Sequence, residues 1–188
     1  WPRRWAWRSA SVPRTPPSSD RMQVLPVRRF PDPVLKRPTR LVERVDGPIR
    51  ALLDAMVRTM RHHPRCVGLA APQVGRSLRL AVMDASGHPK AAAGHGLLVL
   101  VNPRILERDG RLLQREGCLS IPDFTGNVPR ASRIRLAAWD GSGAPMELEL
   151  EGFEAIVVQH EVDHLDGTLF LDRVANLATD VFRRKRYV

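Results

Sequence analysis

The pentapeptide His160-Glu161-Val162-Asp163-His164 constrains this chain more than any other stretch. Residues four positions apart lie on one face of an α-helix, about one turn apart, so two histidines at this spacing can bind one metal ion. The adjacent glutamate can transfer a proton at such a metal. Phe153, Ile156 and Val157 extend the same stripe upstream, and Gly167 favours a helix stop. The pattern predicts a buried metal-binding helix, with two core histidines bonded to carbonyl groups as the alternative.

A third protein ligand is expected upstream of this pair. In the long metalloprotease pattern, a glycine and a third histidine follow the second histidine, and here Gly167 matches but Phe170 replaces the histidine. No glutamate follows Glu161. Two later carboxylates stay open as ligands: Asp172 and Asp180. The remaining candidates are the two cysteines, Cys66 and Cys118.

Three motifs together carry a family resemblance. They are G-L-A-A-P-Q from Gly68, E-G-C-L-S from Glu116 and Q-H-E-V-D-H-L-D-G from Gln159. In this order and spacing they resemble the signature motifs of the peptide deformylases, and the resemblance runs from about Met22 to the C-terminus. Cys66 departs from the pattern, because many bacterial members have glycine there. The resemblance implies a hydrolase that removes the N-formyl group from N-formylmethionine of newly synthesised polypeptides and releases formate.

The resemblance implies Cys118, His160 and His164 as the metal ligands. One thiolate and two imidazoles leave a fourth position open for water, which is typical of a catalytic site. These donors suit Zn²⁺, Ni²⁺, Co²⁺ and Fe²⁺ alike, and the resemblance implies Fe²⁺ as the native metal. Glu161 is then expected to move a proton from water to the leaving amine.

The remaining site residues are expected to hold the substrate. Gln73 and Leu119 fit an oxyanion hole made of one side-chain N–H and one backbone N–H. The resemblance implies that Val67, Gly68 and Gly117 pair with the substrate main chain as an added strand. Two apolar residues one turn before the first histidine are expected to line a methionine pocket, with core packing as the alternative: Ile156 and Val157.

Two other function classes stay open from the residues alone. The first is a metallopeptidase of the His-Glu-x-x-His type, against which Phe170 counts. The second is a small basic RNA-binding domain with a closed structural metal site, for which Cys66 would be the fourth ligand beside Cys118 and the two histidines.

Charge and cysteine content indicate the environment of the protein. The 188 residues suit one domain with a sizeable core, and 30 Lys and Arg against 20 Asp and Glu give a net charge of +10. This charge favours polyanions such as RNA, without predicting sequence-specific nucleic-acid contacts. No apolar run is long enough to cross a bilayer, so no membrane contact is expected. A cysteine needed as a thiolate fits the reducing cytoplasm.

Residues 1–21 differ from the rest of the chain. They contain five arginines, four prolines and one acid, Asp20. We expect a disordered or non-native appendage before a catalytic domain spanning residues 22–188. An organellar transit peptide is the alternative, although the prolines weaken an amphipathic helix.

The remaining periodicities predict an α+β fold with antiparallel or mixed sheets around the metal-binding helix. Cys118 is expected between a strand and a proline-marked loop. A helix is predicted at Pro48–His62, with Asp46 or Gly47 as its cap. Strands are predicted at Leu78–Asp84 and Leu97–Leu106, and a hairpin at Ser132–Asp140 with Pro145–Glu151.

A second helical stripe is expected near the C-terminus, where apolar residues recur from Val174 to Phe182. The run Arg183-Arg184-Lys185-Arg186 follows it. We expect this basic C-terminal helix to contact the ribosome transiently, with a solvated basic tail as the alternative.

Overall fold

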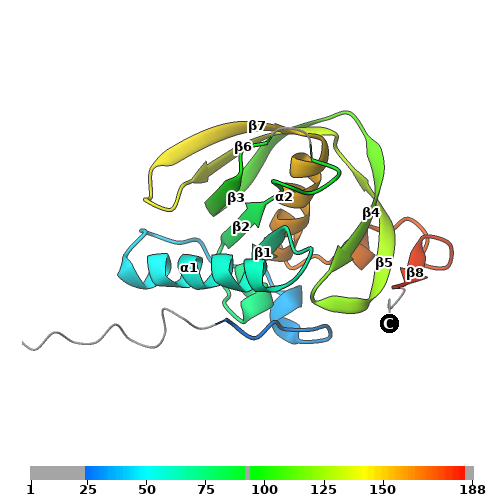
Figure 1. The fold of residues 1–188 in the computed structure, drawn as a ribbon, viewed down its shortest axis with the longest axis horizontal. Helices are drawn as coiled ribbons and strands as arrows, with labels where there is room; N and C mark the ends of the chain where they lie inside the picture. Colours follow the sequence, from blue (N-terminus) through cyan, green and yellow to red (C-terminus); the bar gives the residue numbers. More distant parts are fainter. Residues whose placement is uncertain (1–23, 92–93, 185–188) are drawn as a thin grey trace, which may run out of the picture.

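Two antiparallel sheets flank one central helix in the computed structural model, which describes residues 24–91 and 94–184 (Figure 1). The central helix is α2 (Gly152–Leu165), and it carries both histidines of the pentapeptide. The predicted α+β class is confirmed. The predicted appendage, residues 1–21, lies outside the described residues. Among those residues, no helix combines the length and the apolar content required to cross a bilayer.

The larger sheet has five strands in the order β1-β2-β3-β6-β7, with antiparallel neighbours. Its strands are β1 (Gly68–Ala70), β2 (Leu80–Asp84), β3 (Leu97–Asp109), β6 (Arg133–Trp139) and β7 (Pro145–Glu151). The predicted strands and hairpin are confirmed, and β3 runs beyond its predicted end at Leu106. The Asp140 carboxylate closes the hairpin turn by accepting the N–H groups of Ser142 and Ala144 at 2.8 and 3.0 Å.

The predicted N-terminal helix is α1 (Gly47–His62), which packs against β1 and β2. Its first turn contains Pro48, and the Asp46 side chain accepts the Ile49 N–H at 3.1 Å. This cap supplies a partner for one backbone donor that the helix itself leaves free. Met56 and Met60 on its inner face are almost fully buried. The predicted cap and helix are therefore both confirmed.

The smaller sheet has three strands in the order β4-β5-β8. They are β4 (Leu112–Cys118), β5 (Ile121–Arg130) and β8 (Val181–Arg183). The loop predicted after Cys118 is wrong, because that segment is β5. Its prolines, Pro122 and Pro129, lie outside Phe124–Gly126, the only part of β5 that pairs with β8. Their missing N–H groups therefore cost no hydrogen bond to β8.

The predicted C-terminal helix is wrong. A short helix, α3 (Phe170–Arg173), is followed by a segment of loops and turns. Strand β8 then stands where the predicted helix would end (Figure 1). The Asn176 side chain accepts the Ala178 N–H at 2.9 Å, and such a local bond competes with a helix. The edge of β5 then supplies partners for the backbone of Val181 and Phe182, both good strand formers. The apolar periodicity carries no information about this distant edge.

Helix α2 is buried on nearly every face rather than along one stripe. Val158, Val162 and Leu165 pack into the core of the five-stranded sheet. The helix ends where predicted, with Gly167 in the left-handed region at φ 73°. A Cβ at Gly167 would clash with the backbone of Arg37, so close packing also requires glycine there. The fold thus holds α2 between the sheets, with its histidines facing β4.

Candidate active site

Three side chains from two elements converge between the sheets. His160 and His164 stand one turn apart on α2, with ring centroids separated by 4.9 Å. Cys118, the last residue of β4, places its Sγ 3.2 Å from the His164 Nε2. One donor atom from each residue lies within 4.8 Å of the others. One sulfur and two nitrogen donors at this spacing can hold a single divalent metal ion.

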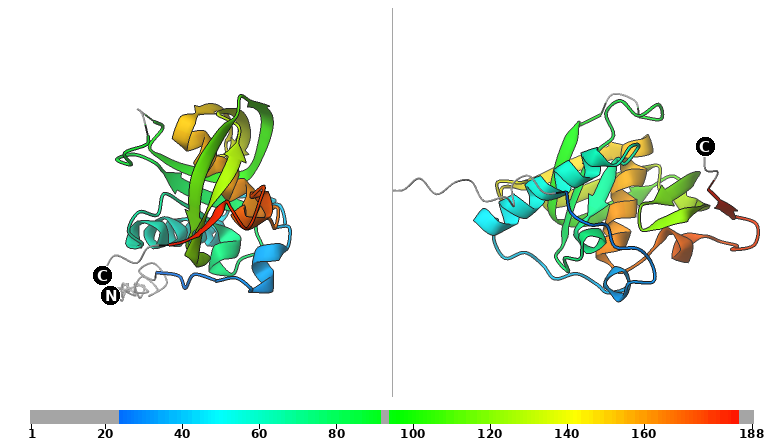
Figure 2. Two further views of the ribbon diagram at one scale, coloured as in Figure 1. Left: turned by 90° about the vertical axis from the view of Figure 1, so that its right-hand side faces the viewer. Right: turned by 60° about the horizontal axis from the view of Figure 1, so that its bottom comes forward.

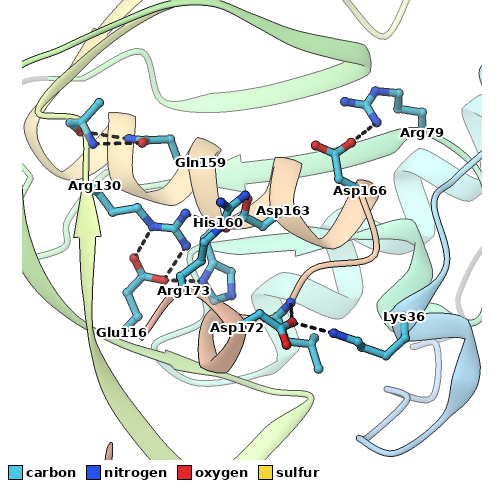
Figure 3. A network of polar contacts seen from close by, with 12 residues as sticks. Lys36, Arg79, Glu116, Arg130, Gln159, His160, Asp163, Asp166, Asp172 and Arg173 are labelled. Atoms are coloured by element: carbon cyan, nitrogen blue, oxygen red, sulfur yellow. Dashed lines mark hydrogen bonds and ion pairs between the residues drawn. The ribbon is translucent and has the colours of Figure 1, made fainter. Parts of the chain in front are cut away.

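A buried polar network fixes the His160 ring (Figure 3). The His160 Nδ1 lies 2.8 Å from Glu116 Oε2, which leaves the Nε2 directed at the cluster. Arg130 donates to both oxygens of Glu116 at 2.7 and 2.9 Å and to Asp163 at 2.6 Å. Arg173 donates to the same Asp163 carboxylate.

This network also keeps Glu116 ionised. Burial opposes its ionisation, but hydrogen bonds from Arg130 and His160 outweigh that effect and lower the pKa of Glu116 to about 2. Sequence reasoning assigned no role to Glu116 and missed Arg130 and Asp163 altogether. Glu116 and Asp163 both belong to the quoted motifs, and Asp163 stands between the two histidines. Their places in the motifs were the signal from which a role for these two carboxylates could have been predicted.

The donors fit a metal ion by three observations. Burial alone would raise the pKa of the Cys118 thiol, but His164 and His160 lower it well below its ordinary value, which favours the thiolate that a metal needs. The His164 Nε2 lies 3.2 Å from Cys118 Sγ and therefore faces the cluster. The Glu161 Oε2 beside the cluster is buried and finds no hydrogen-bond partner in the part of the chain that the structure describes.

Cys66 does not join this cluster. Its Sγ bonds to the Gly68 carbonyl oxygen at 3.1 Å. Burial, together with the nearby Glu161, raises the pKa of Cys66 to about 12, so the residue stays a neutral thiol. Among the described residues, the metal-competent group contains Cys118 as its one cysteine. The geometry does not favour the closed four-ligand site.

Glu161 lies beside the cluster and is only 4% exposed. Burial raises the pKa of Glu161 to about 7, against the lowering effect of His160 and His164. A carboxyl group with this pKa can accept or release a proton near neutral pH. Its Oε1 lies so close to Gly68 that a Cβ there would clash. The observed position of the carboxylate thus leaves no room for a side chain at residue 68.

Gln73 is held in a fixed orientation within the short 3₁₀ helix η3 (Ala71–Val74). Its Oε1 accepts the Ala70 N–H at 2.9 Å. Its Nε2 therefore points away, toward Cys118 Sγ and Ser120 Oγ, each 3.3 Å distant. An amide locked in this way presents its N–H groups, not its oxygen, to the cluster.

A cavity of about 890 Å³ opens above the cluster. It is lined by every residue that the three motifs suggested for catalysis, metal binding or substrate binding except His164, which is buried behind its neighbours. These lining residues are Val67, Gly68, Gln73, Gly117, Cys118, Leu119, Ile156, Val157, His160 and Glu161. Asp172 and Asp180, the carboxylates left open as ligands, do not line it and bond instead to Lys36 and Asn127. Sequence reasoning missed the outer part of the wall, where His88 stacks on Phe153 with ring centroids 4.2 Å apart.

Phe170 occupies the place of the third metalloprotease histidine. It is fully buried in α3, and its ring centroid lies 6.5 Å from that of His160. A phenyl ring supplies no ligand, so the third donor on this side of the fold is the sulfur of Cys118.

Comparison with known proteins identifies the family. The family model described as "Polypeptide deformylase" matches residues 24–180. The peptide deformylase of Alkalilimnicola ehrlichii is 46% identical over 164 residues, which cover 87% of this chain and 89% of the relative. That of Thermodesulfovibrio yellowstonii is 39% identical, covering 87% of this chain and 97% of the relative.

Solved structures agree with these relatives. The crystal structure of the Thermotoga maritima peptide deformylase matches with a TM-score of 0.75 at 39% identity and covers 82% of this chain and 99% of that one. A structure of the Acinetobacter baumannii enzyme with Met-Ala-Ser bound matches with a TM-score of 0.75 at 38% identity, over 81% and 99% of the two chains. The chain therefore belongs to the peptide deformylase family, the metal-dependent hydrolases that remove the N-formyl group from newly synthesised polypeptides.

Proposed function

We propose that Cys118, His160 and His164 bind the catalytic metal ion of this deformylase, with Fe²⁺ as the native metal and Zn²⁺, Ni²⁺ or Co²⁺ as possible replacements. The mutual proximity of their donor atoms, within 4.8 Å, supports this assignment. When bound, a divalent ion would polarise an oxygen and lower the pKa of water there. Glu116 would act on the site through His160, whose ring orientation it sets.

Glu161 is proposed as the proton carrier. It would accept a proton from the attacking water and deliver it to the departing α-amine. Its burial, its pKa of about 7 and its Oε2, which has no partner among residues 24–91 and 94–184, support this role.

Gln73 and Leu119 are proposed to stabilise the oxyanion of the reaction. The Gln73 Nε2 is turned toward Cys118 by the bond between its Oε1 and the Ala70 N–H. Leu119 directly follows Cys118 and lines the same cavity, so its backbone N–H is the natural second donor. A preorganised donor of this kind contributes about 10²–10³ in turnover.

The substrate is proposed to lie between the two sheets. Val67 and Gly68 would pair with the peptide main chain from one side and Gly117 from the other. The methionine side chain would enter the apolar part of the cavity lined by Ile156 and Val157. The Met-Ala-Ser peptide bound to the A. baumannii relative, the product of such a reaction, supports this class of substrate.

A transient ribosome contact is proposed for the basic C-terminal segment. Support comes from the net charge of +10 and from the exposed Arg183 and Arg184. We propose that the protein acts in the cytoplasm, because a cysteine that binds the metal as a thiolate must stay reduced. Salt-dependent co-sedimentation with ribosomes tests the contact, and sedimentation that is unchanged by charge reversal at Arg183 would contradict it.

The buried Glu161 beside the Cys-His-His cluster is the observation that carries the proposal. We expect the protein, loaded with Fe²⁺ without oxygen, to release formate from formyl-Met-Ala-Ser. The acetylated peptide should react far more slowly, because a narrow site admits hydrogen but not methyl on the acyl carbon. Parallel loading with Zn²⁺ compares the metals. No formate from the formyl peptide at full metal occupancy would contradict the assignment.

A further inference from the structure

The C-terminal strand β8 forms part of the wall of the substrate cavity. It pairs with Phe124–Gly126 of β5 as the outer strand of the smaller sheet (Figures 1 and 2). The Arg184 N–H then donates to the Asp123 carbonyl oxygen at 2.8 Å, so the ordered pairing extends one residue past the strand. Arg183 and Arg184 line the cavity together with Phe182. The basic run thus begins at the active site.

Two guanidinium groups flank the backbone expected to pair with the substrate. The Arg184 Nη2 lies directly over Gly117, where a Cβ would clash with it. Arg115 is two residues before Gly117 on β4, and both belong to its exposed face, whereas Glu116 and Cys118 face inward. The Arg115 guanidinium is anchored by stacking 3.5 Å from the Phe182 ring centroid.

The rim of the cavity carries several positive charges. Five exposed cations line it: Arg65, Lys90, Arg115, Arg183 and Arg184. Within residues 24–91 and 94–184, none of these five belongs to an ion pair. The carboxylates among the lining residues are Glu116 and Glu161, both buried, and Glu116 is already bonded to Arg130 and His160.

We propose that this rim selects formylmethionyl peptides whose second and third residues are acidic. Those residues follow the methionine along the edge of β4, beside Arg115 and Arg184. The inference deepens the proposed function and rests on it, because it assumes that the peptide main chain pairs at Gly117. An exposed ion pair changes an affinity by about threefold within a range that reaches about fivefold, so two such pairs multiply to roughly tenfold selectivity at low salt. Salt should weaken it, since the Debye length is about 10 Å at 0.1 M.

The test compares kcat/KM for three C-terminally amidated peptides: formyl-Met-Ala-Ala, formyl-Met-Asp-Asp and formyl-Met-Lys-Lys. With the metal-loaded full chain in low salt, we expect the Asp-Asp peptide to exceed Ala-Ala by roughly tenfold and Lys-Lys to fall below both. Arg184→Glu should lower the Asp-Asp to Ala-Ala ratio to about one or less. The double variant Arg115→Gln and Arg184→Gln repeats the test without introducing new charges.

Arg108→Glu is the matched control. Arg108 is equally exposed and unpaired among the described residues, but it lies on β3 and not at the cavity. This variant changes the net charge as Arg184→Glu does and should keep the wild-type ratio.

The outcomes separate this inference from the proposed function. Hydrolysis of Ala-Ala with equal rates on Asp-Asp would overturn the charge selection alone. An unchanged ratio in Arg184→Glu, or an equal fall in Arg108→Glu, would also overturn it. Hydrolysis of none of the three peptides would refute the proposed function, and the selection with it.

Discussion

Replacing Gly68 by alanine should uncouple activity from stability. The new Cβ would clash with Glu161 Oε1 and lie 2.9 Å from its Cδ and 3.0 Å from Val157 Cγ1. The atom in the way is the end of a side chain whose other oxygen has no partner among the described residues. The carboxylate can therefore move aside while the backbone stays in place. We expect the unfolding free energy to fall by only about 1–2 kcal/mol, the lower part of the range for an overpacked core.

Turnover should suffer far more than stability. A displacement of 1 Å in a catalytic group costs roughly a hundredfold, and full loss of a proton carrier costs about 10²–10⁴. We therefore expect kcat on formyl-Met-Ala-Ser to fall by about two orders of magnitude or more. Metal content should remain stoichiometric, because the clash does not reach Cys118, His160 or His164.

The assay measures formate release, metal content by elemental analysis and the urea midpoint for each variant. Gly47→Ala is the matched control: a Cβ there meets nothing within 4 Å, and Gly47 opens α1, where alanine suits the helix. It should keep full turnover. Wild-type turnover in Gly68→Ala would refute the reasoning that Glu161 must occupy its observed position. A loss of turnover together with the metal would point to a disrupted cluster instead.

Three further predictions concern the metal, the proton and the appendage. Cys118→Ala should lose stoichiometric metal, whereas Cys66→Ala should keep it; in elemental analysis, full metal in Cys118→Ala would sink the assignment, and loss of metal in Cys66→Ala would point to the four-ligand site. Glu161→Gln should keep the metal and lose about 10²–10⁴ in kcat, and near-normal deformylation would exclude it as proton carrier. A chain starting at Met22 should match the full chain in Tm and turnover, and a large drop in either would show that residues 1–21 matter.

Arg130→Met should weaken both the fold and the metal site. It would leave the buried Glu116 and Asp163 carboxylates without their shared partner, which costs about 3–5 kcal/mol in unfolding free energy. Since Glu116 orients His160, metal affinity should also fall by about 10–100-fold in a competition assay with a chelator. Unchanged affinity would show that the network serves stability alone.

The sequence was most informative where chemistry demands particular residues at short spacing. The histidine pair, the glutamate beside it and the cap at Asp46 are each defined within one or two helical turns, so local rules suffice to find them. Arg130 is different, because its partners Glu116 and Asp163 lie 14 and 33 residues away and meet it only in the fold. No local pattern marks such a bond.

The C-terminal error has a similar physical origin. Val174 to Phe182 shows helical spacing, but Val181 and Phe182 pair with β5, which is distant in sequence. A strand of three residues has too little alternation to be recognised, and its stability comes from the edge that it joins. The first two residues of the basic run, Arg183 and Arg184, consequently line the cavity at the end of a strand, not of a helix.

The edges of the two sheets bear on how the protein avoids self-association. Strand β8 covers one edge of the smaller sheet, but β4 and β1 remain edge strands on the two sides of the cavity. Open edges invite pairing with other chains and hence aggregation. Here β1 is only three residues long, the β4 ladder breaks its register between Gly117 and Cys118, and Arg115 adds charge beside the gap. A short, narrow slot of this kind can receive the flexible end of a single peptide while it excludes the long flat strands that build fibrils.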